Sequence, residues 1–334
     1  MSPADRERLL VAIRAFRGRR VLVLADLVAD EFVYGRTDRV SREAPVLILR
    51  HAGAEVRLGG GANAVHNVRT LGGQPLPVGV LGRDDHGRAL RALLRAKRID
   101  ARHVISQPGY ATPVKTRILA GGTHSTKQQL VRIDRLMSLE ARPAAARRVI
   151  ALLRRFRGPV DGVLVSDYGF GLFTPAVVRA AIAFARRRRV PVTVDSRYAL
   201  TRFRGMTAVT PNEPEVEAAL GLTIGHDRGR LEAAGHTLLR RLGARAVLIT
   251  RGSDGMALFE RGRPTLHIPI YGSDEVADVT GAGDTVIAAF TLALAAGASP
   301  ADAARLANCA GGVVVMKRGT ATVSAAELRA AVRS

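Results

Sequence analysis

Three short apolar runs of this chain each end in an aspartate, and this pattern limits the possible folds more than any other. The runs cover residues 21–26, 163–167 and 192–195, and helical segments at 144–156 and 174–189 alternate with the last two. Buried parallel strands are apolar throughout, and their carboxyl ends meet at one edge of an α/β sheet. A single aspartate is explained as a helix N-cap, but three predict a polar site at that edge.

A glycine turn near the C-terminal end predicts the other half of this site. Residues 278–285 read Asp-Val-Thr-Gly-Ala-Gly-Asp-Thr and lead into an Ala- and Leu-rich helix. Unpaired N–H groups at a helix start bind anions such as phosphate, and glycines let a ligand approach them. A carboxylate there would repel phosphate unless it takes a proton from the attacking alcohol, as in phosphoryl transfer. We therefore expect Asp284 as general base beside an anion hole formed by the backbone of Gly281, Ala282 and Gly283; the alternative is an acidic residue that only favours the helix dipole.

Two further motifs place amides and carboxylates at helix starts. A second glycine turn at 59–61 opens a helix on which Asn63 and Asn67 lie one turn apart, where amides can bind sugar hydroxyls or simply lie on a polar surface. Asn212 and Glu215 have the spacing of a helix capping pair. The same two side chains also suit the water shell of Mg²⁺. At both places the two alternatives remain open.

Strand-like segments without helices between them predict a small second sheet. Residues 112–120 and 128–133 alternate like a two-stranded ribbon around the turn at Gly121-Gly122. We pair this ribbon with the segment at 32–58 as a lid over the site, inserted at about 31–58 and 112–134 into one domain of 334 residues. Such a lid excludes water during phosphoryl transfer. Its exposed edges are expected to pair between subunits and give a homodimer.

Charge and composition exclude several classes of protein. The formal net charge of +22 suggests a polyanion partner, but the arginines are spread along the chain and only 4% of residues are aromatic. An arginine-rich surface is favoured over specific nucleic-acid binding. The chain has a single cysteine, a charged start without a signal sequence and no apolar run of membrane length. These features predict a cytoplasmic protein that uses no membrane.

Four motifs in order resemble those of the PfkB/ribokinase-like carbohydrate kinases. They are Gly59-Gly60-Gly61-Ala62-Asn63, Asn212-x-x-Glu215, residues 250–255 and residues 278–284. The resemblance implies an α/β fold, a three-layer α/β/α sandwich with a mainly parallel central sheet and a β-sheet lid. It also implies an ATP-dependent kinase for a sugar hydroxyl. Within the family the chain looks most like the heptose 7-phosphate kinases of ADP-heptose synthesis, through residues 34–46, 115–117, 128–134 and 166–169, but without their C-terminal nucleotidyltransferase domain.

The resemblance also implies the roles of individual residues. Sugar binding is expected from Asp26, Asp30, Gly60, Gly61, Asn63, Lys115, Arg117, Gln128 and Asp167. ATP is expected near Asp195, Asn212, Glu215, Thr250, Gly252, Gly255 and Asn308. Mg²⁺ is expected through water at Asn212 and Glu215, and a monovalent cation such as K⁺ at Asp278 and Thr280.

Two departures bear on the substrate. Heptose kinases usually have a lysine where this chain has Phe170, and an Asp-Pro-Lys run where it has Asp195-Ser196-Arg197. Loss of a lysine weakens the expected grip on a sugar phosphate, and Arg197, Lys115 or Arg117 are candidates to replace it. The alternative is a family kinase for another sugar, sugar phosphate or nucleoside.

Overall fold

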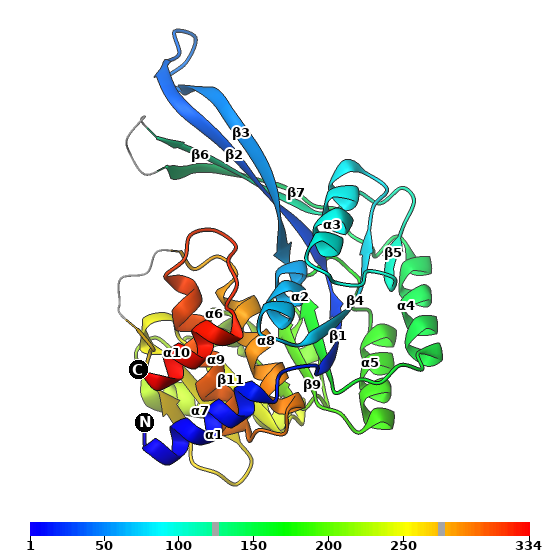
Figure 1. Ribbon diagram of the computed structural model, residues 1–334, viewed down its shortest axis with the longest axis vertical. Helices are drawn as coiled ribbons and strands as arrows, with labels where there is room; N and C mark the ends of the chain where they lie inside the picture. The colour runs from blue at the N-terminus through cyan, green and yellow to red at the C-terminus, as the bar shows by residue number, and fades with distance from the viewer. Residues whose placement is uncertain (122–126, 273–277) are drawn as a thin grey trace.

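The central element is a nine-stranded sheet within residues 1–121, 127–272 and 278–334, which the computed structural model describes (Figure 1). The strand order is β13-β12-β11-β10-β9-β8-β1-β4-β5. All neighbours pair in parallel except β11 with β12 and β12 with β13. The strands are β1 Arg20–Ala25, β4 Gln74–Leu81, β5 Val104–Ser106, β8 Gly162–Asp167, β9 Val192–Ser196, β10 Ala208–Val209, β11 Ala246–Thr250, β12 Met256–Glu260 and β13 Leu266–Ile268.

Helices cover both faces of this sheet and form two hydrophobic layers. Successive β1 residues point to opposite faces, so Val21 and Val23 join one layer while Leu22 and Leu24 join the other. The first layer contains α1 Pro3–Arg14, α2 Gly61–Thr70, α3 Asp85–Ala96, α8 Ala282–Ala295, α9 Pro300–Val315 and α10 Ala325–Arg333. The second contains α4 Pro143–Arg155, α5 Pro175–Arg188, α6 Glu213–Leu220 and α7 Arg228–Leu242. Single 3₁₀ turns lie at Leu200–Arg202 and Gly252–Asp254. The expected three-layer sandwich is confirmed.

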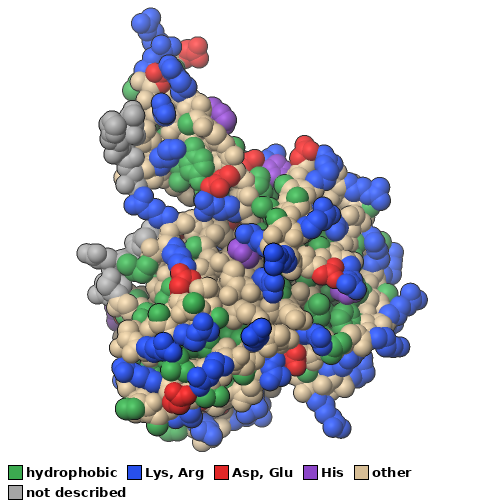
Figure 2. All heavy atoms as spheres, viewed as in Figure 1, with side chains coloured by type: hydrophobic (Ala, Val, Ile, Leu, Met, Phe, Trp, Pro, Cys, Tyr) green, Lys and Arg blue, Asp and Glu red, His purple; other side chains and the backbone are tan. Residues whose placement is uncertain are grey.

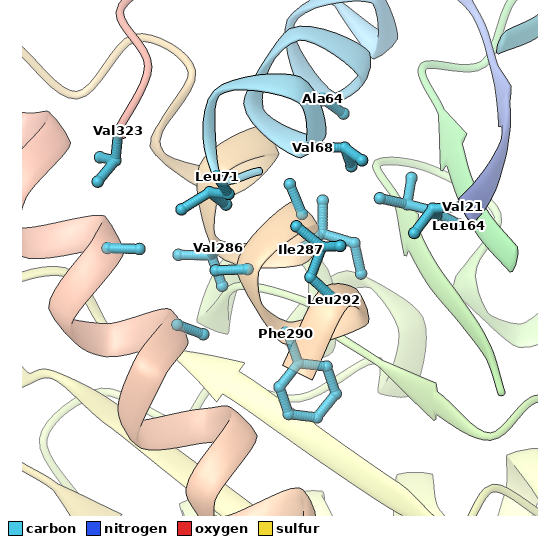
Figure 3. Packing of buried hydrophobic residues seen from close by; sticks show 14 of the residues in the cluster. Val21, Ala64, Val68, Leu71, Leu164, Val286, Ile287, Phe290, Leu292 and Val323 are labelled. Carbon is cyan, nitrogen blue, oxygen red and sulfur yellow. The ribbon is translucent and has the colours of Figure 1, made fainter. Parts of the chain in front are cut away.

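Helix α8 lies inside the protein rather than on its surface. Every residue from Asp284 to Ala293 is buried, as expected for a helix that is apolar on all sides. Val286, Ile287 and Phe290 pack among side chains of α2, the central strands and the C-terminal segment (Figure 3). The close-packed core therefore fixes the start of α8, where the predicted base lies.

A second sheet of four strands projects from the body in the order β3-β2-β6-β7 (Figure 1). Its strands are β2 Leu27–Val40, β3 Leu47–Gly60, β6 Val114–Gly121 and β7 Gln128–Arg135, close to the predicted insertion. The Gly122 side of the predicted turn lies outside the described residues. Figure 2 shows a hollow between this projecting sheet and the body, with Lys and Arg side chains spread over the viewed face. None of the helices in the described part of the chain combines the length and apolar character that a membrane crossing requires.

Candidate active site

The three aspartates that follow apolar runs lie at one edge of the central sheet. In the strand register, Ala25 pairs with Ser166, and Ser166 pairs with Asp195. Asp26, Asp167 and Asp195 therefore lie at neighbouring strand ends, as the sequence predicted. This edge also holds the glycine turn before α8, because Gly283 lies close to Asp195: a Cβ on Gly283 would be 3.8 Å from Asp195 Oδ2.

Asp284 is buried at the start of α8 with only 2% of its surface exposed. Asn63 Nδ2 donates a hydrogen bond to its Oδ2 at 3.1 Å, and the Tyr168 hydroxyl donates to its Oδ1 at 3.0 Å. Burial raises the pKa of Asp284 to about 7, although these two donors and the positive charge of Arg197 act in the opposite direction. A carboxylate with a pKa near neutrality, held in one orientation, is suited to accept a proton from an alcohol.

The turn before α8 determines which backbone N–H groups are available to an anion. Gly281 has a φ of +79°, and a Cβ there would come within 2.5 Å of Asn63 Nδ2, so both its conformation and its neighbour require glycine. The Ala282 N–H donates to the Val279 carbonyl at 3.2 Å. Among the described residues the Gly283 N–H has no such partner. Of the predicted anion hole, Gly283 is therefore better placed than Ala282 to bind an anion.

A cavity of about 510 Å³ begins at Gly283 and runs along the C-terminal half of the chain. This volume lies in the range of small-molecule sites. Five of the residues predicted to bind ATP line it, namely Asn212, Thr250, Gly252, Gly255 and Asn308. Arg251 belongs to the motif at 250–255, but the sequence assigned it no role of its own. It also lines the cavity and donates to Glu213 Oε1 at 2.6 Å. That ion pair ties the turn after β11 to the start of α6.

Asp26 and Asp167 shape the loop that follows β8. Asp26 Oδ2 accepts hydrogen bonds from the backbone N–H groups of Tyr168 at 2.9 Å and Phe170 at 3.2 Å. Asp167 accepts from the Gly169 N–H at 2.9 Å and from the Ser196 hydroxyl at 2.7 Å. Burial, and next the charge of Asp167, raise the pKa of Asp26 to about 7. The carboxylates of Asp26 and Asp167 thus hold the loop at residues 168–170 over the edge of the central sheet.

Asp30 and Arg117 form a buried ion pair at the base of the projecting sheet. Arg117 Nη1 donates to Asp30 Oδ1 at 2.8 Å, and the Thr320 hydroxyl donates to Asp30 Oδ2 at 2.7 Å. Both side chains are less than a tenth exposed. Both Asp30 oxygens are therefore engaged with protein donors. The ion pair joins β2 to β6 within the projecting sheet, and the Thr320 hydrogen bond connects it to the segment after α9.

The remaining predicted sugar-binding residues differ in their placement. Gly60 and Gly61 lie at the start of α2, and the Gly61 N–H donates to the Asp26 carbonyl at 3.1 Å. Gln128 pairs with Ala120, at the end of β7 opposite to Arg135. Because the Arg135 end adjoins the body, the structure does not bring Gln128 close to the sheet edge.

Two cations converge on the ring of Tyr168, next to the predicted base. Lys115 Nζ lies 4.9 Å from the ring centroid, and Arg197 Cζ lies 4.6 Å from it. Lys115 is only 9% exposed, and burial lowers the pKa of its ammonium group. Among the described residues neither cation forms an ion pair with a carboxylate. The sequence pointed to both cations, but nothing in it indicated that Tyr168 bonds to Asp284, 116 residues away.

Comparison with known proteins decides the family. The profile described as pfkB family carbohydrate kinase matches residues 27–327. The chain belongs to the pfkB family of carbohydrate kinases. It is therefore a phosphotransferase that acts on a sugar hydroxyl.

This pfkB kinase is 44% identical over 310 residues to the bifunctional protein HldE of Geobacter sulfurreducens, covering 92% of the chain and 61% of the relative. It is 41% identical over 322 residues to the HldE of Caulobacter vibrioides, covering 96% and 65%. The chain thus spans less than two thirds of these relatives. In fold it resembles phosphofructokinase-2 from Escherichia coli in complex with potassium, with a TM-score of 0.74, 18% identity and coverage of 95% and 98%. It also resembles Arabidopsis thaliana ribokinase complexed with ribose and ATP, with a TM-score of 0.72, 20% identity and coverage of 95% and 99%.

The pfkB kinase offers Mg²⁺ few direct ligands. No group of three or more His, Cys, Asp or Glu side chains gathers at one point in the described residues. Asn212 and Glu215 form a capping box, in which the Asn212 N–H donates to Glu215 Oε2 at 3.0 Å. Burial raises the pKa of Asp195 well above its ordinary value, and the nearby Glu215 charge raises it further. A bound Mg²⁺ would offset the repulsion between these two carboxyl groups, with nucleotide phosphates and water supplying most of its ligands.

The predicted monovalent-cation residues organise the turn before α8. Asp278 Oδ1 accepts the Thr280 N–H at 2.8 Å, and Asp278 Oδ2 accepts the Gly319 N–H at the same distance. The carboxylate thus joins the turn to the segment after α9. Its two oxygens retain lone pairs, so a carboxylate and a hydroxyl are available there to a hard cation.

Proposed function

We propose that this kinase uses ATP to phosphorylate heptose 7-phosphate and produces heptose 1,7-bisphosphate. The observation that carries the proposal is that Lys115 and Arg197 both lie over the ring of Tyr168, whose hydroxyl bonds to Asp284. Among the described residues neither cation has a carboxylate partner, so both charges are available to bind a phosphate group that the sugar already carries. Arg197 would thus replace the cation that Phe170 removes. The similarity to the HldE proteins supports the same substrate class.

The proposed reaction follows from the residues around Asp284. Asp284 accepts the proton of the sugar hydroxyl while the hydroxyl oxygen forms a bond to the γ-phosphorus of ATP. The bond from that phosphorus to the bridging oxygen breaks, and ADP leaves with the electron pair. The Gly283 N–H and the start of α8 stabilise the charge on the transferred group. Mg²⁺, when bound, neutralises the phosphate oxygens of the nucleotide.

Other residues would position the substrates and exclude water. Asn63 is proposed to bind a sugar hydroxyl next to the one that reacts, since its amide already touches Asp284. The nucleotide would occupy the cavity lined by Asn308 and Thr250. The projecting sheet is proposed to close over the sugar as a lid, and Asp278 and Thr280 to hold a monovalent cation.

A screen of phosphate acceptors tests this proposal. Heptose 7-phosphates, hexose phosphates, unphosphorylated sugars and nucleosides are compared with ATP as donor, and saturable activity restricted to the heptose 7-phosphate is expected. Saturable activity only with unphosphorylated sugars or nucleosides would overturn the assignment and favour the other family activities.

Replacing Lys115 by Met should raise the KM for the sugar phosphate about 10- to 100-fold, because a charge-assisted hydrogen bond of about 1.5–3 kcal/mol is lost. The KM for ATP should stay unchanged. Met preserves the apolar stem and removes a buried charge, so the variant is expected to fold. Lys127→Met is the matched control, because Lys127 immediately precedes strand β7 of the same sheet and its ammonium group also lies over a tyrosine ring, that of Tyr34. Equal sugar KM values for both variants would contradict the role of Lys115.

We also propose a homodimer formed through the lid. Strand β7 is an edge strand whose residues are all exposed, and Val131 and Ile133 are about half exposed. Open edges with apolar side chains tend to pair with another strand. Sedimentation should give the mass of a dimer for the wild type and of a monomer for Val131→Lys/Ile133→Lys. A wild-type monomer at micromolar concentration would contradict the proposal.

A further inference from the structure

We infer that Tyr168 is a positioning residue that holds the Asp284 carboxylate in its reactive orientation and joins it to the cation pair Lys115 and Arg197. The coupling to a substrate phosphate rests on the proposed function. The effect on Asp284 concerns the sugar kinase reaction itself, whichever sugar is used.

Tyr168 lies at the meeting point of the elements that build the site. Its backbone N–H is bonded to Asp26, and its hydroxyl is bonded to Asp284. Its ring packs against Val28 of β2 and stacks on Phe170 with centroids 6.5 Å apart. The side chain is therefore fixed at both ends and along its ring, so the hydroxyl can impose one direction on the carboxylate.

The tyrosine hydroxyl also determines how readily Asp284 ionises. A donor to a carboxylate stabilises the charged form, and Tyr168 shares this task with Asn63. The other charged groups that act on Asp284 are Arg197, which favours its ionisation, and Asp30, which opposes it; Asp195 also lies close enough to interact with it. Removal of the phenol should therefore leave a base that ionises only at higher pH.

The same ring connects the base to the cations. Lys115 belongs to lid strand β6, whereas Arg197 follows β9 in the body. Both lie within 5 Å of the ring centroid. A phosphate held between these cations would thus be seated against the residue that orients the base. Tyr168 would then contribute both to the binding of the sugar phosphate and to the alignment of the reacting hydroxyl.

Tyr168→Phe separates these roles, because it removes the hydroxyl and keeps the ring. For the wild type, kcat/KM should fall as the pH drops below about 7, since Asp284 is active only when ionised. In Tyr168→Phe this acid limb should move up by about one to two pH units, because a hydrogen bond to a charged group is worth about 1.5–3 kcal/mol. The rate should recover at high pH. An acid limb at the wild-type pH would overturn the positioning role.

Tyr168→Leu tests the connection to the cations. It should raise the KM for the sugar phosphate about tenfold above that of Tyr168→Phe, with the KM for ATP unchanged. Equal sugar KM values in the two variants would overturn the coupling. Tyr198→Phe is the matched control, because that tyrosine is 80% exposed. If the acceptor screen finds only an unphosphorylated sugar, the proposed function fails, while a shifted acid limb still supports the positioning role.

Discussion

Replacing Asp284 by Asn should lower kcat on the order of 10³-fold, in line with the loss of a general base, while ATP still binds. The amide cannot take the proton of the sugar hydroxyl, whereas the Gly283 N–H and the nucleotide cavity are unchanged. Single-turnover kinetics and a calorimetric ATP titration measure the two properties. Asp85→Asn is the matched control, since Asp85 is also a first-turn aspartate but lies exposed on α3.

The same substitution should stabilise the protein at alkaline pH. The pKa of Asp284 is about 7 in the folded protein against 3.8 as the ordinary value, so folding favours the protonated carboxyl. Its contribution to stability is fully present below about pH 4 and is lost as the pH rises towards 7. Asn carries no charge at any pH. The gain in the free energy of unfolding of Asp284→Asn over the wild type should therefore be absent near pH 4 and reach at most about 4 kcal/mol at pH 8.

Near-normal turnover in Asp284→Asn would remove Asp284 from the role of base.

Replacing Arg117 by Met should lower the free energy of unfolding by about 3–5 kcal/mol, the usual effect of breaking a buried ion pair. Asp30 would keep the Thr320 hydroxyl as a donor but would lose its counter-charge at a site that is almost closed to water. Urea unfolding measures the loss. Hydrogen exchange of β2 and β6 then shows whether the projecting sheet opens first.

Two control variants test whether the loss of stability comes from the unpaired buried charge of Asp30. Asp30→Asn combined with Arg117→Met removes both charges and should recover much of the lost stability, because no unpaired charge remains buried. Arg50→Met removes an exposed partner of Asp38 on the same sheet and should change stability by less than about 1 kcal/mol. A loss of that small size in Arg117→Met would show that the pair contributes little to holding β2 and β6 together.

Local patterns were enough to predict much of the fold and the position of the site. Strand ends after apolar runs identified the sheet edge, because parallel strands bring their carboxyl ends together. The run after Asp284 predicted a helix, and its uniform apolarity matches the burial of α8. Among the segments that were not predicted, β5 and β13 have only three residues each, too few for a clear alternation.

The roles of individual carboxylates were harder to predict. Asp26 and Asp167 occupy the predicted edge, yet their oxygens are engaged with a loop formed by residues 168–170. Whether a carboxylate faces a ligand or a backbone amide depends on where a distant segment folds back. The bond from Tyr168 to Asp284 has the same origin, since no periodicity relates the two positions.

The junction between the projecting sheet and α2 has a mechanical consequence. Strand β3 ends at Gly60, and α2 begins at the next residue and carries Asn63 two positions further on. If the projecting sheet tilts as a rigid unit, the N-terminal end of α2 rotates with it. The Asn63 amide, which bonds to Asp284, then moves as well. Substitutions at the outer tip of the sheet should consequently change kcat more than the affinity of the kinase for its substrates.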